Sequence, residues 1–296
     1  MSAEGILVGI HGLENKPPLD EKRRWWRAAI VEGLQRNCGH DGGAFPFEFV
    51  YWADLRYDKP LLGDANDEPY QSVGGSGPFP RHRPDADATL NDGVVSKVYR
   101  GLAALQTATG ATPVDDAILE HRFDDLWHYH SETPFARQVR RRLIDVLEQL
   151  AGRRVLLAAH SMGSIIAYDA LRMLEREAPS VQVEHLVTLG SPLGLAEVRA
   201  KIAEENGAAR VPNNVNRWTN MADNRDLAAV AGELVEVFAP NDRGVGVDDI
   251  AVVNAYLRPD GSANRHKSYG YLRTPEFSEV ALGFTACSNA RLERQA

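Results

Sequence analysis

Short apolar runs alternate with stretches of helical spacing along most of the chain. Runs that end in turn-forming residues predict buried strands at residues 5–10, 45–52, 155–159, 181–189 and 213–221, and further strands at 233–238 and 250–257. Helical spacing predicts helices at residues 19–37 and 133–150, after residue 164, at 195–205, and from 275 onward. This alternation is typical of an α/β fold, with a mostly parallel sheet covered by helices on both faces. We expect one such domain to span residues 1–296.

The pattern breaks after the second predicted strand. Residues 55–92 are rich in glycine, proline and charged residues, and two stretches of helical spacing follow at 94–105 and 113–129. We expect an inserted loop and helical cap at about residues 55–130. Such a cap could cover a substrate site and offer it three aromatic side chains, Phe79, Trp127 and Tyr129. A surface loop followed by packing helices is an equally good interpretation.

The most specific chemical signal is the stretch RRVLLAAHSMGS at residues 153–164. It places Ser161 between an apolar strand and a helical pattern, and AHSMG matches the G-x-S-x-G nucleophile elbow with alanine in the first small position. Small residues on both sides of the serine leave room for the strained turn that exposes its hydroxyl. Ser161 is therefore the predicted nucleophile. A serine that only caps the following helix is the alternative, which the strand and helix context disfavours.

A second motif, His11-Gly12-Leu13, ends the first predicted strand. Its position resembles that of the loop that supplies an oxyanion donor in lipases and esterases. We expect the backbone N–H groups of Leu13 and Met162 to stabilise an oxyanion, with His11 and Gly12 beside the substrate. The alternative is that Gly12 is an ordinary turn glycine.

A serine nucleophile requires a histidine base, and the histidine requires an acid. Downstream of Ser161, His185 falls inside a predicted strand, whereas His266 falls in a polar segment that could reach the serine. His266 is the expected base. Two aspartates, Asp223 and Asp226, follow the strand predicted at residues 213–221, and either could be the acid.

Asp226 is preferred as the acid because Asp226-Leu227-Ala228-Ala229 resembles the D-x-V-A segment of lipase and phospholipase relatives. Leu227 and Ala228 depart from the usual Pro-Val of that segment. Asp223 stays open as the alternative acid, and Asp242 is a more distant one. The aspartate that is not the acid would cap a turn.

Taken in chain order, the segments HGL, AHSMG, LGSP, WTNMADNRD and HKSY resemble the lipase and esterase branch of the α/β-hydrolase superfamily. The resemblance covers nearly the whole chain outside residues 55–120. It implies a serine hydrolase that cleaves carboxylic esters of lipid-like or other apolar acyl substrates. In this interpretation Ser161 forms the acyl-enzyme, His266 transfers the proton and Asp226 orients His266.

Two alternative functions remain. The first is an acyltransferase or thioesterase that uses the same triad. The second is a non-catalytic binding module of the same fold, which would be favoured if His266 lay far from Ser161, because the serine would then have no activator.

The composition of the chain limits the classes of molecule that it is expected to bind. A net charge of -8 argues against general nucleic-acid binding, which requires a basic surface. Two cysteines without metal-ligand spacing predict neither a disulfide framework nor a metal site, and no cofactor is expected. No stretch approaches the roughly 20 apolar residues of a transmembrane helix, and the first residues do not resemble a secretory signal. We therefore expect a cytoplasmic protein that acts on a small-molecule or lipid ester.

Overall fold

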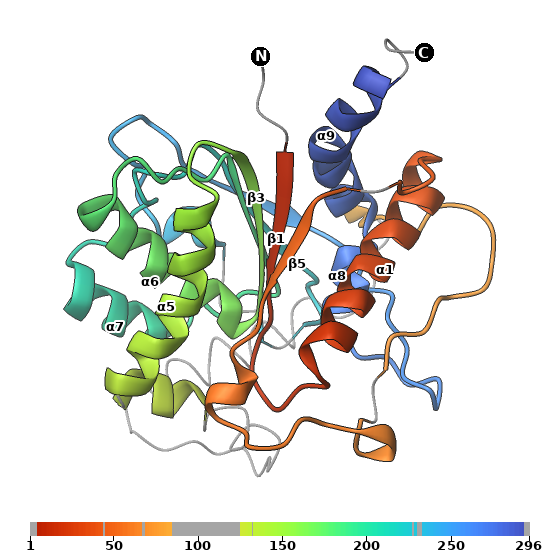
Figure 1. Ribbon diagram of the computed structural model, residues 1–296, viewed down its shortest axis with the longest axis horizontal. Helices are drawn as coiled ribbons and strands as arrows, with labels where there is room; N and C mark the ends of the chain where they lie inside the picture. Colours follow the sequence, from red (N-terminus) through yellow and green to blue (C-terminus); the bar gives the residue numbers. More distant parts are fainter. Residues whose placement is uncertain are drawn as a thin grey trace.

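The computed structural model describes residues 5–43, 45–66, 69–84, 125–131, 133–226, 228–229 and 233–292, without the side chains of residues 64, 133 and 286–292. Within these ranges the centre of the fold is a six-stranded sheet in the order β2-β1-β3-β4-β5-β6 (Figure 1), and every neighbouring pair of strands is parallel. The strands are β1 (Gly5–Ile10), β2 (Phe47–Val50), β3 (Arg154–His160), β4 (His185–Leu189), β5 (Trp218–Ala222) and β6 (Val247–Ala251).

Helices cover both faces of the sheet (Figure 1). One face carries α1 (Leu19–Cys38), α8 (Ser268–Leu272) and α9 (Pro275–Leu292), and the other carries α5 (Thr133–Gln149), α6 (Met162–Glu177) and α7 (Ala196–Asn206). Residues 125–131 are also helical. Each face has its own apolar core, so the inner strands are buried on both sides and have nearly continuous apolar sequences such as GILVGI. The predicted α/β class, parallel sheet and two helical layers are confirmed.

The short 3₁₀ helices are η1 (Ala53–Leu55), η2 (Gly63–Ala65) and η3 (Leu234–Glu236). The last of these corrects one predicted strand, because residues 233–238 contain η3 rather than a strand. Leu234 and Phe238 are buried while Glu236 between them is exposed, whereas the alternation of a strand would bury all three positions.

The predicted strand at residues 250–257 is also displaced. The last strand, β6, runs from Val247 to Ala251 and contains two aspartates. It lies at one edge of the sheet and only its first residue is buried. An edge strand needs no continuous apolar run, so a search for such runs placed the strand too late in the chain.

Most of the predicted cap falls outside the described residues, including the helix expected at 94–105 and most of the one expected at 113–129. The described residues 69–84 contact α1 and α9. Tyr70 donates a hydrogen bond to Glu32 of α1, the Phe79 N–H donates to Asn37 of α1, and Arg81 pairs with Glu276 of α9. In the described part of the chain, no helix is both long and apolar enough to cross a bilayer.

Candidate active site

Ser161 lies in a sharp turn between β3 and α6. Its backbone has φ 55° and ψ -130°, and within the described residues Glu14 is the one other non-glycine residue with positive φ. A conformation of this kind is strained and persists where the surrounding packing fixes it. Gly163 takes part in that packing, because a Cβ atom there would lie 2.7 Å from the carbonyl oxygen of His11. The turn therefore has the geometry expected of a nucleophile elbow.

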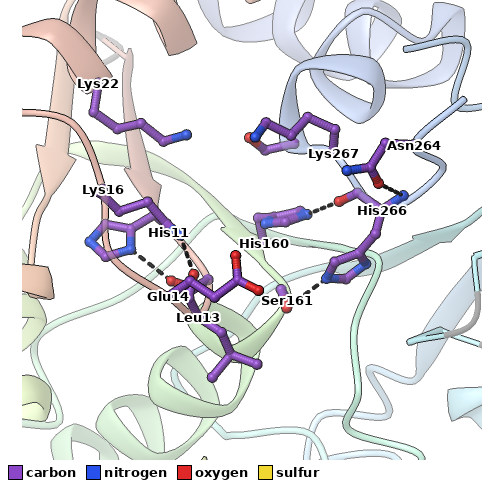
Figure 2. A pocket seen from close by; sticks show the side chains of 12 residues that line it. His11, Leu13, Glu14, Lys16, Lys22, His160, Ser161, Asn264, His266 and Lys267 are labelled. Carbon is purple, nitrogen blue, oxygen red and sulfur yellow. Dashed lines mark hydrogen bonds between the residues drawn. The ribbon is translucent and has the colours of Figure 1, made fainter. Parts of the chain in front are cut away.

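His266 lies between Ser161 and Asp226. Its Nε2 is 2.8 Å from Ser161 Oγ, and its Nδ1 is 2.8 Å from Asp226 Oδ2 and 3.0 Å from Asp226 Oδ1 (Figure 2 shows the first contact). A carboxylate accepts hydrogen bonds only, so Nδ1 carries the proton and Nε2 presents its lone pair to the serine hydroxyl. This is the tautomer that a general base requires.

Three further groups fix Asp226, which is almost fully buried. The Tyr271 hydroxyl donates to Oδ2 at 2.6 Å, and the Ala228 N–H donates to Oδ1 at 3.0 Å. Gly190 has φ 55°, and a Cβ atom there would lie 2.7 Å from Asp226 Oδ2. Burial, followed by the negative charge of Asp226, raises the pKa of Tyr271 well above its ordinary value, so its hydroxyl keeps its proton as a donor.

The structure brings Asp226, and not Asp223, to the histidine. Asp223 accepts hydrogen bonds from the backbone and guanidinium of Arg225, and from the Asn254 N–H at 2.8 Å. It therefore holds together the loops that follow β5 and β6. A buried aspartate that caps a turn is the role expected for the carboxylate that does not contact His266.

His160 occupies a position that the sequence did not reveal. Its Nε2 donates to the carbonyl oxygen of His266 at 2.7 Å, and the two rings lie 4.9 Å apart between centroids (Figure 2). Burial, followed by the charge of His266, holds the pKa of His160 well below its ordinary value, so the ring is neutral. From the sequence alone, His160 is expected to point away into the packing. Its ring instead lines the pocket, and its hydrogen bond holds the backbone of His266.

The loop after β1 lies directly against the nucleophile. A Cβ atom on Gly12 would lie 2.5 Å from Ser161 Cβ, so only glycine allows this approach. Both predicted oxyanion residues therefore adjoin the serine, since Leu13 follows Gly12 in the chain and Met162 begins α6. The positive end of the α6 dipole also lies at Ser161, where it favours negative charge.

His11 shapes this loop from inside. Its Nδ1 lies 2.8 Å from the carbonyl oxygen of Gly12, and its Nε2 lies 3.1 Å from the backbone nitrogen of Trp52, whose N–H donates to it. The ring is buried and stacks on Trp52, and burial lowers its pKa, so it stays neutral. His11 lines the pocket as expected, but both of its nitrogens are bonded within the protein.

Asp125 braces the same loop from a distant part of the sequence. Glu14 has φ 73°, and its N–H donates to Asp125 Oδ2 at 2.7 Å. The Tyr57 hydroxyl donates to the other oxygen of this buried carboxylate at 2.8 Å. Lys16 donates through Nζ to the carbonyl oxygen of Leu13. The backbone around Leu13 is thus held from both sides.

An open pocket leads to Ser161 (Figure 2), and the empty space of about 520 Å³ in and over it includes open solvent. Its described lining has one aliphatic side chain, that of Leu13. The other side chains are polar or charged, and they include Glu14 and three lysines, Lys16, Lys22 and Lys267.

The three aromatic residues predicted to contact substrate do not belong to the described lining. Phe79 is buried beneath the guanidinium of Arg36, 4.0 Å from its ring centroid. Tyr129 is buried and donates to Asp169 at 2.7 Å, while Trp127 is 61% exposed. Phe79 and Tyr129 therefore pack against Arg36 and Asp169 within the fold. The sequence pattern alone could not distinguish this packing from a role in a substrate-covering cap.

Within the described residues, no group of three or more His, Cys, Asp or Glu side chains is arranged to hold a metal ion. Comparison of the sequence with models of known protein families finds no match, and comparison with curated proteins finds no relative. Function is therefore inferred from the geometry around Ser161.

Proposed function

We propose that the protein is a serine hydrolase of the α/β-hydrolase type that cleaves carboxylic esters through an acyl-enzyme at Ser161. The observation that carries this proposal is the position of His266, whose two ring nitrogens contact the Ser161 hydroxyl and the Asp226 carboxylate at 2.8 Å each. The three residues come from separate segments, in the chain order Ser, Asp, His of the α/β-hydrolases. A serine that only capped a helix would need neither partner.

In the proposed reaction, Ser161 Oγ attacks the acyl carbon while His266 Nε2 takes the hydroxyl proton. Asp226 stabilises the resulting imidazolium. The carbonyl oxygen becomes an oxyanion, which the N–H groups of Leu13 and Met162 stabilise. Collapse of this intermediate breaks the ester bond, and His266 returns the proton to the departing alkoxide.

Water completes the cycle. It attacks the acyl-enzyme carbonyl with His266 again as the base, and the acid product leaves as Ser161 regains its proton. An acyltransferase or thioesterase would use the same residues with a different acceptor or leaving group. Most side chains of the described pocket lining are polar, so the lining does not indicate an apolar acyl group. The proposal therefore specifies a carboxylic ester and does not include the apolar acyl substrate expected from the sequence.

The test is covalent labelling with a fluorophosphonate probe, followed by turnover of p-nitrophenyl esters. We expect the intact protein to be labelled at Ser161, and Ser161→Ala and His266→Ala to lose labelling and about a millionfold in turnover. Ser262→Ala, which removes an exposed loop hydroxyl, is the matched control and should react like the intact protein. Labelling at another residue, or turnover that survives Ser161→Ala, would overturn the proposal. Products formed in the presence of an added alcohol separate hydrolysis from acyl transfer.

A further inference from the structure

Two polar atoms of the pocket lining have no hydrogen-bond partner among the described residues. They are Nδ1 of His160 and the hydroxyl oxygen of Ser268. Both residues are buried, with exposed fractions of 8% for His160 and 3% for Ser268. Most buried polar side-chain atoms in folded proteins do have a partner, because leaving one unpaired costs free energy. Two such atoms in the pocket beside Ser161 therefore point to a bound group that pairs with them.

The ring of His160 presents a lone pair. Its Nε2 lies 2.7 Å from the carbonyl oxygen of His266 (Figure 2), and a carbonyl oxygen only accepts hydrogen bonds, so Nε2 carries a proton. Burial lowers the pKa of His160 and keeps the ring neutral, so Nδ1 has no proton of its own. Nδ1 can therefore accept a hydrogen bond and cannot donate one.

Ser268 lies on the same side of the pocket. It follows His266 by two residues and begins α8. The His160 ring lies 4.9 Å from the ring of His266 and 6.1 Å from that of Tyr271, between centroids, so it borders the turn that contains Ser268. Neither His160 Nδ1 nor the Ser268 hydroxyl is among the unpartnered polar atoms that the described part of the fold seals from solvent. Both atoms are therefore accessible from the pocket.

A single hydroxyl group can pair with both atoms at once. Its O–H donates to the Nδ1 lone pair of His160, and its oxygen accepts from the hydroxyl of Ser268. A carboxylate or an ether oxygen cannot donate to His160, and an ammonium group cannot accept from Ser268. Water also fits both partners, so a substrate hydroxyl has to reproduce the hydrogen bonds of the water that it displaces.

We infer that His160 and Ser268 form a subsite for a hydroxyl group, and that the preferred substrate is an ester with a hydroxyl close to its carbonyl, on its acyl or its alcohol half. The hydroxyl has to be close because His160 directly precedes the nucleophile Ser161, and Ser268 follows the base His266 by two residues. This inference rests on the proposed ester hydrolysis at Ser161 and specifies its substrate class.

The test compares esters that differ at one position beside the carbonyl. On the acyl half, the probes are the p-nitrophenyl esters of hexanoate, 2-hydroxyhexanoate and 2-methoxyhexanoate. On the alcohol half, they are the propyl, 2-hydroxypropyl and 2-methoxypropyl esters of hexanoate, with release of acid followed by titration. Each kcat/KM is divided by the alkaline hydrolysis rate of the same ester, which removes differences in intrinsic reactivity.

We expect the hydroxy ester to exceed both the unsubstituted and the methoxy ester by about tenfold in one of the two halves. A site that hydrogen-bonds a substrate hydroxyl rejects analogues that lack it, because its own polar groups are then left unpaired. The methoxy group can accept from Ser268 but cannot donate to His160. The half that shows the preference identifies where the substrate carries its hydroxyl.

Two variants locate the effect. His160→Gln retains a donor for the His266 carbonyl but has no acceptor in the place of Nδ1, and Ser268→Ala removes the hydroxyl. Each should reduce the ratio of hydroxy to unsubstituted kcat/KM about three- to tenfold, whereas Ser268→Thr keeps a hydroxyl and should keep most of the preference. The matched controls are His185→Gln, at a buried histidine of β4, and Ser262→Ala, at an exposed loop serine. Both should leave the ratio unchanged. If His160→Gln fails to fold, the two Ser268 variants decide the question.

Failure of the inference is distinct from failure of the proposed function. If esters are cleaved at Ser161 but the unsubstituted or methoxy probe reacts as well as the hydroxy probe in both halves, the hydroxyl subsite is wrong and the hydrolase proposal stands. The same holds if His160→Gln and Ser268→Ala leave the ratio unchanged. If no ester is cleaved and the fluorophosphonate does not label Ser161, both are wrong. Binding of 2-hydroxyhexanamide to Ser161→Ala, measured by calorimetry, that is tighter than binding of hexanamide and weakened by Ser268→Ala would support the subsite independently of turnover.

Discussion

The two sides of Ser161 are built in different ways. On one side a chain of side-chain contacts runs from the serine through His266 and Asp226 to Tyr271. On the other side, the loop after β1 presents backbone, in which Gly12 contacts the serine and Asp125 holds the N–H of Glu14. On the first side, we therefore expect kcat to fall when a titratable group is changed. On the second side, we expect kcat to fall when a larger side chain is added or when a hydrogen bond that holds the loop is removed.

The largest effect expected from a change on the acid and base side, short of removing Ser161 or His266, comes from Asp226→Asn. The amide cannot stabilise the imidazolium, and it can pair with the wrong tautomer of His266. We expect kcat to fall about ten-thousandfold with the fold intact. Steady-state turnover of a p-nitrophenyl ester, with circular dichroism of the variant, measures both.

Asp223→Asn is the matched control, since it changes a neighbouring buried aspartate that contacts Arg225 and Asn254. It should lower the unfolding temperature and leave kcat within about tenfold of the intact protein, because one hydrogen bond to a charged group contributes about 1.5–3 kcal/mol to stability. A folded Asp223→Asn that loses more kcat than Asp226→Asn would reverse the assignment of the two aspartates.

On the oxyanion side the largest effect is expected from Gly12→Ala. The added methyl would lie 2.5 Å from Ser161 Cβ, so the loop has to move away from the serine. We expect a loss of about a hundredfold to a thousandfold in kcat, the size that follows removal of one oxyanion donor. Gly283→Ala in α9, where a Cβ atom meets nothing within 4 Å, is the matched control and should keep full activity. Equal kcat for both glycine variants would contradict the close approach of the loop.

A smaller effect is expected from removing the brace. Asp125→Ala deprives the Glu14 N–H and the Tyr57 hydroxyl of their acceptor. We expect kcat to fall about tenfold, because a hydrogen bond to a charged group contributes about 1.5–3 kcal/mol and part of that holds the loop. Tyr57→Phe removes one of these bonds and leaves the Glu14 contact, so its kcat should lie between that of the intact protein and that of Asp125→Ala. If Tyr57→Phe costs more kcat than Asp125→Ala, the brace acts through the tyrosine and not through Glu14.

The same contrast explains what the sequence could and could not predict. The elbow is local, so residue type and spacing around Ser161 sufficed to predict its geometry, and chain order directed attention to His266 and Asp226. Apolar runs likewise predicted the inner strands, with ends displaced by a few residues. Periodicity was least informative where burial is partial, as in β6. It was also ambiguous around η3, where the buried residues Leu234 and Phe238 are an even number of positions apart and so also fit the alternation of a strand.

The supports of the site could not be predicted because they are contacts between distant residues of ordinary type. Asp125 and Glu14 are 111 residues apart, and Tyr271 and Asp226 are 45 apart. No local pattern distinguishes such a tyrosine or aspartate from one at the surface. Gly190 had a partial signal, because LGSP follows a predicted strand, but its close approach to Asp226 emerges only from the fold. Phe79 and Tyr129 show the converse, as aromatic residues that the pattern associated with substrate and that the fold uses for packing.

Substitution of His160 should have the smallest effect on turnover, and it should also change how the free energy of unfolding depends on pH. Its folded pKa is depressed by burial, whereas the unfolded side chain titrates near pH 6.5. Above about pH 6.5 neither state binds the proton, and below it only the unfolded chain does, so the protein loses up to about 1.4 kcal/mol of stability per pH unit through this group as pH falls.

His160→Gln retains a donor for the His266 carbonyl and removes this titration. At pH values near 8 we expect turnover to fall only a few-fold, because the amide can still hold the backbone of the base. Urea unfolding between about pH 6.5 and 5 should show a shallower loss of stability than in the intact protein, although not a flat one, since burial depresses the pKa of His11 in the same direction. An unchanged slope would show that His160 takes up its proton in the folded state. A loss of turnover above about a hundredfold would mean that the ring takes part in the chemistry and does more than position His266.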